Sequence, residues 1–212
     1  MGASTRLVQL DVDSTFIQQE AIELLAAKAG VLEEVSRVTE SAMRGELDFA
    51  ESLIARVALL RGLREDAIFQ VQKEIKLTDG AVELVTLLHE KGHYISLVSG
   101  GFMNILQPIV DDLKIDFYLA NTLEVIDGKL SGRVLGKIID RAAKADALRE
   151  FAQACSIELS DTVAIGDGAN DLDMMEIAGI SIAFNAKPIV EAAADYSIKE
   201  PSLRSVPSLI NL

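Results

Sequence analysis

The sequence contains one cysteine, Cys155, and only two histidines among 212 residues. A lone cysteine excludes an intramolecular disulfide, and the scarcity of both residue types excludes a zinc site built from a cysteine and histidine cluster. The simplest interpretation of Cys155 is a small buried side chain on a helix. A chain without disulfides is typical of a reducing compartment, so we expect a cytoplasmic protein.

Basic residues are also scarce, because 20 Lys and Arg stand against 33 Asp and Glu, for a formal net charge of -13. A field of this sign repels polyanions, and no run of Lys or Arg offers a footprint for nucleic acid. We therefore expect no nucleic-acid partner. A phosphorylated metabolite can bind such a protein only where a cation and local donors reverse the field, so a metal site is expected.

Long hydrophobic runs are missing as well. The hydrophobic residues make up 50% of the chain, enough for a sizeable core. Lys, Glu, Asp or Gly nevertheless interrupts each apolar stretch before the ~18 residues that a membrane-spanning helix needs. Residues 1–5 lead into a strand-like segment without the charged and apolar regions of a signal peptide. We expect no membrane partner, and either a monomer or a homodimer.

The first 76 residues combine one short strand with a long helical stretch. The apolar run Arg6–Asp11 has the character of a buried parallel strand. Helical periodicity then continues from Phe16 to about Lys76 and is divided by Gly30, Gly45 and Gly62. Since glycine commonly ends a helix, we expect four consecutive helices here.

Strands and helices alternate in the rest of the chain. The expected helices are 80–90, 102–113, 142–155, 171–178 and a short one near residue 190; the expected strands are 94–99, 117–120, 162–165 and 180–184. Asp127-Gly128 predicts a hairpin. The alternation predicts an α/β fold with a Rossmann-like parallel sheet covered by helices on both faces. We assign residues 1–15 and 77–212 to this core and residues 16–76 to an inserted helical cap.

Polar side chains gather where the expected strands end. The segments are Asp11-Val-Asp13-Ser-Thr15, Ser99-Gly100-Gly101, a helix start near Lys144, and Asp167-Gly-Ala-Asn170-Asp171. Ligands of open parallel sheets bind beyond the carboxyl ends of the strands. A solvated acidic turn would explain the first segment alone, but not four such segments in this order.

Together these segments resemble the haloacid dehalogenase superfamily, over nearly the whole chain. DVDST corresponds to its first motif, VSGG to the second, Lys144 to the third and GDGANDL to the fourth. Within it, DSTFIQQEAIELLA, SLVSGGF, KADAL and VAIGDGANDLDMM resemble the phosphoserine phosphatase family. The resemblance implies a haloacid dehalogenase core with a small cap, and Mg²⁺-dependent hydrolysis of O-phospho-L-serine to L-serine and phosphate, the last step of serine biosynthesis.

The two carboxylates of DVDST suit a two-step phosphate transfer. On an extended segment, Asp11 and Asp13 leave the chain on the same side and can address one phosphate. Asp11 would be the nucleophile that forms an aspartyl-phosphate. Asp13 would protonate the leaving serine oxygen and then activate water.

The remaining motif residues are assigned to the metal and the phosphate. Asp167 would bind Mg²⁺ together with the Asp11 carboxylate and the Asp13 carbonyl, and Asp171 would support the metal without direct contact. Ser99, the Gly100 amide and Lys144 would hold phosphate oxygens. Asn170 would reach the phosphate or a water on the metal, or cap a helix. Without the resemblance, Lys144 would be read as a surface lysine.

Substrate choice is expected to come from the cap. The resemblance places Glu20 at the substrate ammonium and Arg56 at its carboxylate. Met43 and Phe49 would close the pocket over the substrate. Ordinary solvated charges and apolar packing are the simpler alternatives for these four residues.

Three other functions compete with phosphoserine hydrolysis. As in related enzymes, the substrate could be another small phosphomonoester, or the phosphate could pass to an acceptor such as homoserine. An ATP-driven member is disfavoured by Asp13, because a nucleotide leaving group needs no proton. A catalytically silent binding module is disfavoured because Asp11, Asp13, Lys144 and Asp167 are all present.

Overall fold

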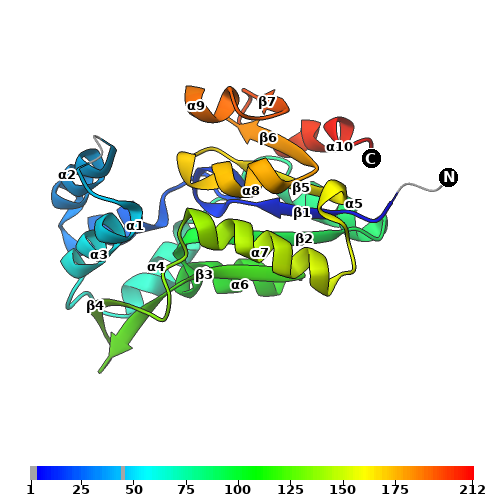
Figure 1. Cartoon of the computed structure of the whole chain (residues 1–212). Coiled ribbons are helices and arrows are strands. Elements are labelled where there is room, and N and C mark those ends of the chain that lie inside the picture. Colours follow the sequence, from blue (N-terminus) through cyan, green and yellow to red (C-terminus); the bar gives the residue numbers. More distant parts are fainter. Residues whose placement is uncertain (1–3, 44–45) are drawn as a thin grey trace.

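The computed structural model describes residues 4–43 and 46–212, and the side chain of Met43 lies outside the described part. A seven-stranded sheet with the order β4-β3-β2-β1-β5-β6-β7 crosses the molecule (Figure 1). The strands are β1 (Leu7–Leu10), β2 (Tyr94–Phe102), β3 (Phe117–Ile126), β4 (Lys129–Leu135), β5 (Thr162–Gly166), β6 (Ile180–Phe184) and β7 (Tyr196–Ile198). All neighbouring pairs are parallel except β3 and β4.

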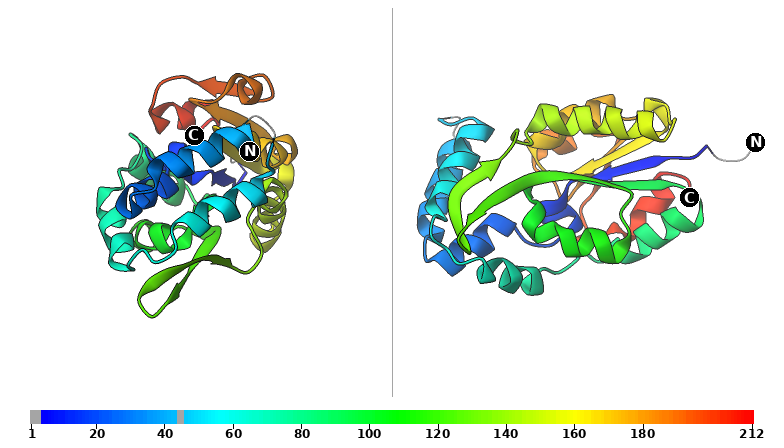
Figure 2. Two further views of the ribbon diagram at one scale, coloured as in Figure 1. Left: turned by 90° about the vertical axis from the view of Figure 1, so that its left-hand side faces the viewer. Right: turned by 90° about the horizontal axis from the view of Figure 1, so that it is seen from below.

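Helices cover both faces of this sheet. One face carries α5 (Ala81–Glu90), α6 (Met103–Leu113) and α10 (Val206–Leu209), and the other carries α7 (Arg141–Ala154), α8 (Leu172–Ile177) and α9 (Pro188–Glu191). The view from below in Figure 2 separates these layers. The α/β architecture predicted from the alternation of strands and helices is therefore confirmed. Helices lie on both sides because both faces of parallel strands must be buried.

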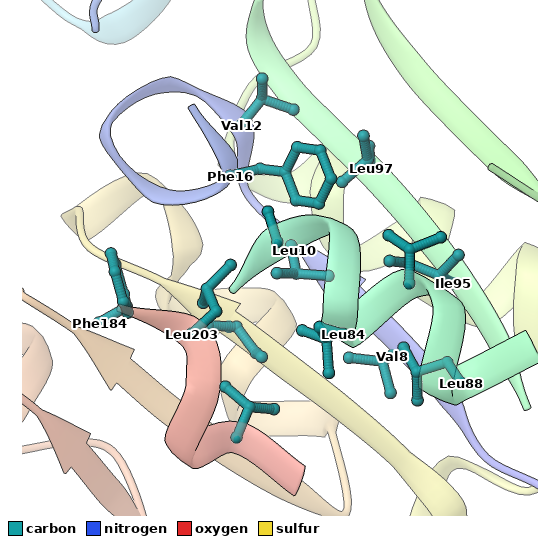
Figure 3. Packing of buried hydrophobic residues seen from close by; sticks show 14 of the residues in the cluster. Val8, Leu10, Val12, Phe16, Leu84, Leu88, Ile95, Leu97, Phe184 and Leu203 are labelled. Carbon is teal, nitrogen blue, oxygen red and sulfur yellow. The ribbon is translucent and has the colours of Figure 1, made fainter. Parts of the chain in front are cut away.

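The central strand β1 shows how the two faces are divided. Val8 and Leu10 join the cluster formed with α5, together with Phe16, Leu84 and Leu97 (Figure 3). The alternate residue Leu7 joins the cluster of α7 and α8 on the other face. Successive side chains of a strand point to opposite faces, so a strand buried on both sides reads as a continuous apolar run.

The four helices expected between residues 16 and 76 are present. They are α1 (Ala21–Ala29), α2 (Leu32–Met43), α3 (Phe49–Leu59) and α4 (Asp66–Glu74). Figure 1 shows α1, α2 and α3 beyond the carboxyl end of β1. They do not form a core of their own, since their buried side chains share one cluster with Phe102, Ile105, Leu123 and Leu130 of the sheet and α6.

The hairpin predicted at Asp127-Gly128 forms, with positive φ at both residues (51° and 71°). Its second strand, β4, pairs antiparallel with β3, as a hairpin requires, and forms one edge of the otherwise parallel sheet. The hairpin also bonds to the loop after α3, because Gly62 N donates to Leu130 O (2.8 Å) and Leu130 N donates to Leu63 O (2.8 Å). This loop supplies the partners that an edge strand otherwise lacks.

Among the strands and α-helices of the described residues, β7 and α10 were not predicted. They contain three and four residues, too few for a periodic pattern to show. Among the described residues, no helix combines the length and the apolar character needed to cross a membrane.

Candidate active site

The chain leaves β1 through a wide turn that interrupts the extended segment expected from the sequence. Ile17 N donates to Val12 O (2.9 Å) across this turn. Asp13 keeps extended angles (φ -62°, ψ 133°), whereas Ser14 is left-handed (φ 58°). The expected extended geometry holds at Asp11 and Asp13 and is lost at Ser14, and such wide turns are frequent at functional sites. Asp11 and Asp13 nevertheless line the same cavity.

Asp11 is paired with a completely buried lysine. Lys144 Nζ donates to Asp11 Oδ1 (2.5 Å) and to Asp171 Oδ1 (2.7 Å). Burial and the neighbouring Asp171 raise the pKa of Asp11 well above its usual range, and Lys144 opposes this. Burial alone would lower the pKa of Lys144, but the two carboxylates outweigh it and raise that pKa. Lys144 therefore remains a cation that can offset negative charge at Asp11.

The start of α7 places Lys144 in this position. The Asp140 side chain caps the helix by accepting from Ala143 N (2.9 Å). The buried Gln9 of β1 donates to the backbone carbonyl of Lys144 (3.0 Å). Sheet and helix are thus joined by a hydrogen bond at the residue whose side chain reaches Asp11.

Asp13 has a different environment from Asp11. Its carboxyl accepts from Ala21 N (2.7 Å) and from the Ser99 hydroxyl (2.9 Å). Burial raises its pKa to about 6, Glu20 adds to the rise, and the two hydrogen bonds oppose it. A Cβ atom at position 101 would collide with Oδ2 of Asp13, which explains the glycine there. Ser99 itself is 1% exposed and lies behind the cavity wall.

The turn after β5 completes a group of carboxylates. Asp171 is fully buried and accepts from Gly168 N (3.1 Å), so it holds both this turn and Lys144. One carboxylate oxygen each from Asp11, Asp167 and Asp171 lie within 4.8 Å of one another. Burial, followed by Asp171, raises the pKa of Asp167 to about 6. Hard oxygen donors at this spacing fit a metal cation, whose charge would relieve the mutual repulsion that Lys144 offsets in part.

The helical segment brings charged residues over this group. Glu20 accepts from the Ser14 hydroxyl (2.6 Å), and Arg56 Nε donates to Ser52 O (3.2 Å). Burial lowers the pKa of Arg56, although Glu20, Asp13 and Glu23 counteract this. The cavity therefore presents the Arg56 guanidinium among carboxylates above the predicted phosphate site.

One cavity of about 730 Å³ brings together most of the expected site residues. Its lining includes Asp11, Asp13, Glu20, Phe49, Arg56, Gly100, Asp167 and Asn170. Phe49 closes against the core, since a Cβ at position 100 would lie 2.6 Å from its ring. Ser99, Lys144 and Asp171 lie behind the wall, where they contact Asp13, Asp11 and Gly168 of the lining, respectively. The expected contribution of Met43 lies outside the described side chains.

Sequence reasoning missed several residues at this site. Ser52, Arg141 and Lys187 line the cavity, and Ser14 holds Glu20. Ser14 could have been suspected because it follows Asp13 directly. Lys187 could have been suspected because it lies just after the end of β6. Ser52 carried no signal beyond its place one helical turn before Arg56.

A comparison with known families accounts for this arrangement. The family profile of haloacid dehalogenase-like hydrolases matches residues 8–176. The chain belongs to this family. The predicted family resemblance is thereby confirmed, and with it the expected type of core. The family's match spans all four motif segments named above.

Among curated proteins, the chain is similar to phosphoserine phosphatases. It is 48% identical to the phosphoserine phosphatase of Lactococcus lactis, over 96% of this chain and 94% of that relative. It is 53% identical to the phosphoserine phosphatase of Streptomyces coelicolor, over 98% of this chain and 50% of that relative. The chain thus spans about half the length of the Streptomyces coelicolor relative and of the Mycobacterium tuberculosis one.

Solved structures give the same picture. A substrate-bound phosphoserine phosphatase complex is 40% identical, with a TM-score of 0.92, covering 98% of this chain and 99% of that one. A phospho-aspartyl intermediate analogue of phosphoserine phosphatase is 41% identical, also with a TM-score of 0.92 and the same coverage.

Proposed function

We propose that this protein is a Mg²⁺-dependent phosphoserine phosphatase that hydrolyses O-phospho-L-serine to L-serine and phosphate. The observation that carries the proposal is the cavity in which Asp11, paired with Lys144, faces Glu20 and Arg56. The similarity to phosphoserine phosphatases over nearly the full length of the Lactococcus lactis relative supports it. The place of this reaction would be the last step of serine biosynthesis.

The first half-reaction transfers the phosphoryl group to Asp11. A carboxylate oxygen of Asp11 forms a bond to phosphorus while the bond between phosphorus and the serine oxygen breaks. Asp13 gives its proton to that oxygen, so serine leaves as the neutral alcohol. Lys144 stays within hydrogen-bond distance of Asp11 and offsets the charge there.

The second half-reaction restores the enzyme. Asp13, now ionised, takes a proton from water, and the water oxygen bonds to phosphorus as the bond to Asp11 breaks. Ser99 and Ala21 N hold the Asp13 carboxyl, which keeps it in one place for both proton transfers. Phosphate then leaves and Asp11 is free again.

The carboxylates of Asp11 and Asp167, with the Asp13 carbonyl, would hold Mg²⁺. When bound, the ion supplies positive charge for the phosphate oxygens. Asp171 already accepts hydrogen bonds from Lys144 Nζ and Gly168 N, which suits the supporting role proposed for it.

The proton transfer assigned to Asp13 can be tested with two leaving groups. Asp13→Asn should reduce the rate with phosphoserine by about 10²–10⁴-fold, because the serine oxygen then leaves without a proton. The loss should be smaller with an aryl phosphate, whose phenolate leaves unaided. The measurement is kcat for both substrates, and equal losses would contradict the assignment.

The charges above the phosphate site suit a zwitterion. We place the substrate ammonium at Glu20, with Glu23 nearby, and the carboxylate at Arg56. An Arg fork holds a planar carboxylate with two hydrogen bonds. Residues 16–76, which carry these side chains, would be the cap that reads the amino acid.

Selectivity for the amino acid should depend on Arg56. Arg56→Ala should reduce kcat/KM for phosphoserine by a factor that corresponds to a loss of roughly 2–5 kcal/mol of transition-state stabilisation, because the buried substrate carboxylate loses its partner. Phosphoethanolamine, which lacks the carboxylate, should change little. Arg56→Lys is the matched control, since it keeps the charge but not the fork. Its kcat/KM for phosphoserine should lie between those of the wild type and Arg56→Ala. A proportional loss on both substrates would show that Arg56 only supports the fold.

A screen of phosphate release from small phosphomonoesters, with homoserine offered as an acceptor, tests the proposal as a whole. Preference for phosphoserine with release to water is expected. Cytoplasmic location, a monomer or homodimer, and the absence of nucleic-acid and membrane partners stay predictions.

A further inference from the structure

Ser52 on α3 carries a buried hydroxyl without a partner. The residue is 2% exposed and lines the cavity. In the part of the chain that the structure describes, Oγ of Ser52 neither donates nor accepts a hydrogen bond. Leaving a buried hydroxyl unpaired is costly, and such groups are rare in native proteins. A hydroxyl at this place therefore points to a ligand that supplies the missing partner.

The usual reason for a serine inside a helix does not apply here. Ser and Thr side chains in helices often donate to the carbonyl one turn earlier. Thr39 on α2, which lines the same cavity, donates to Val35 O (3.0 Å) in this way. Ser52 makes no such bond, and alanine would suit the helix interior better.

The neighbours of Ser52 define the kind of ligand. Residues three and four apart share one face of a helix, so Phe49, Ser52 and Arg56 lie along the same side of α3. All three line the cavity. Arg56 Nε also donates to Ser52 O (3.2 Å), which holds the guanidinium beside this turn. An oxygen atom bound by Arg56 would lie close to the Ser52 hydroxyl, and an anionic oxygen accepts from it.

We propose that Ser52 is a further substrate-binding residue, whose hydroxyl donates to the carboxylate that Arg56 holds. This inference rests on the proposed function, because the carboxylate is that of phosphoserine. Ser52 lies at the amino-acid end of the cavity and has no contact with Asp11 or Asp13 among the interactions described above. Its loss should therefore weaken binding and leave the chemical steps intact.

Ser52→Ala tests this directly. KM for O-phospho-L-serine should rise about tenfold, as expected for a lost hydrogen bond to a charged group, while kcat changes by less than about twofold. kcat/KM for phosphoethanolamine should stay the same. The melting temperature without substrate should not fall, since the change removes an unpaired buried hydroxyl. Ser52→Cys, which keeps the shape with a weaker donor, should give an intermediate KM.

Thr39→Val is the matched control, because it removes a cavity hydroxyl that already has a partner within α2. Its KM for phosphoserine should stay within about twofold of wild type. The inference is overturned if Ser52→Ala leaves KM unchanged, or raises it equally for phosphoethanolamine. Failure of the proposed function would instead appear in the wild-type protein, as no phosphate release from phosphoserine.

Discussion

Asp11→Asn is expected to abolish phosphate release and to abolish formation of the phospho-enzyme. An amide cannot supply the anionic oxygen that attacks phosphorus. Neither Asp171 nor Asp13 can replace it without rearrangement, because Asp171 is bound by Lys144 and Gly168 N, and Asp13 is bound by Ala21 N and Ser99. The measurement is phosphate release together with trapping of acid-stable labelled protein from ³²P-labelled substrate.

The variant should still fold, because Lys144 keeps its pair with Asp171. Asp146→Asn is a suitable control, since Asp146 lies on α7, is exposed, and forms an ion pair with Arg149 one turn along the same helix. It should retain wild-type activity. Substantial turnover by Asp11→Asn, with an unchanged circular dichroism spectrum, would contradict the assignment of the nucleophile.

Removal of divalent metal should have an equally large effect. EDTA should silence the protein and Mg²⁺ should restore it, because the carboxylates of Asp11 and Asp167 lie close together and repel the phosphate unless a cation joins them. Ca²⁺ should restore little activity, since it accepts looser and higher coordination than Mg²⁺ and would misplace Asp11 for attack.

The same site can be followed without turnover. Mg²⁺ should raise the melting temperature of the wild-type protein, as any ligand of the native state does. The shift should be much smaller in Asp167→Asn, which removes one ligand charge. Full activity in EDTA, or equal shifts in both proteins, would disprove the metal site proposed here.

Much of the fold could be predicted because its signals are local. Gly30 ends α1 with φ 71°, as a glycine after a helix should. Asp127 and Gly128 take up the positive φ angles that a two-residue hairpin requires. The continuous apolar run of β1 indicated a strand buried on both faces, and its position between β2 and β5 agrees.

The errors and omissions arise where local signals are weak or several conformations compete. The turn after Asp11 could be read as extended because Asp13 does have extended angles. The left-handed Ser14 and the bond from Ile17 N to Val12 O show the chain curling back. The edge strand β4 owes its place to the loop after α3 as well as to β3. Such pairings depend on segments far apart in the sequence.

The sequence by itself determined which chemical groups this protein has and in what order its elements occur, because periodicity, turn residues and motif spacing act over a few residues. Only the tertiary structure decided what these groups do to one another. Lys144 meets Asp11 across 133 residues, and its ammonium and the buried carboxylates shift each other's pKa values only once water is removed. The unpaired hydroxyl of Ser52 likewise has meaning only inside a cavity, since in an exposed helix water would be its partner.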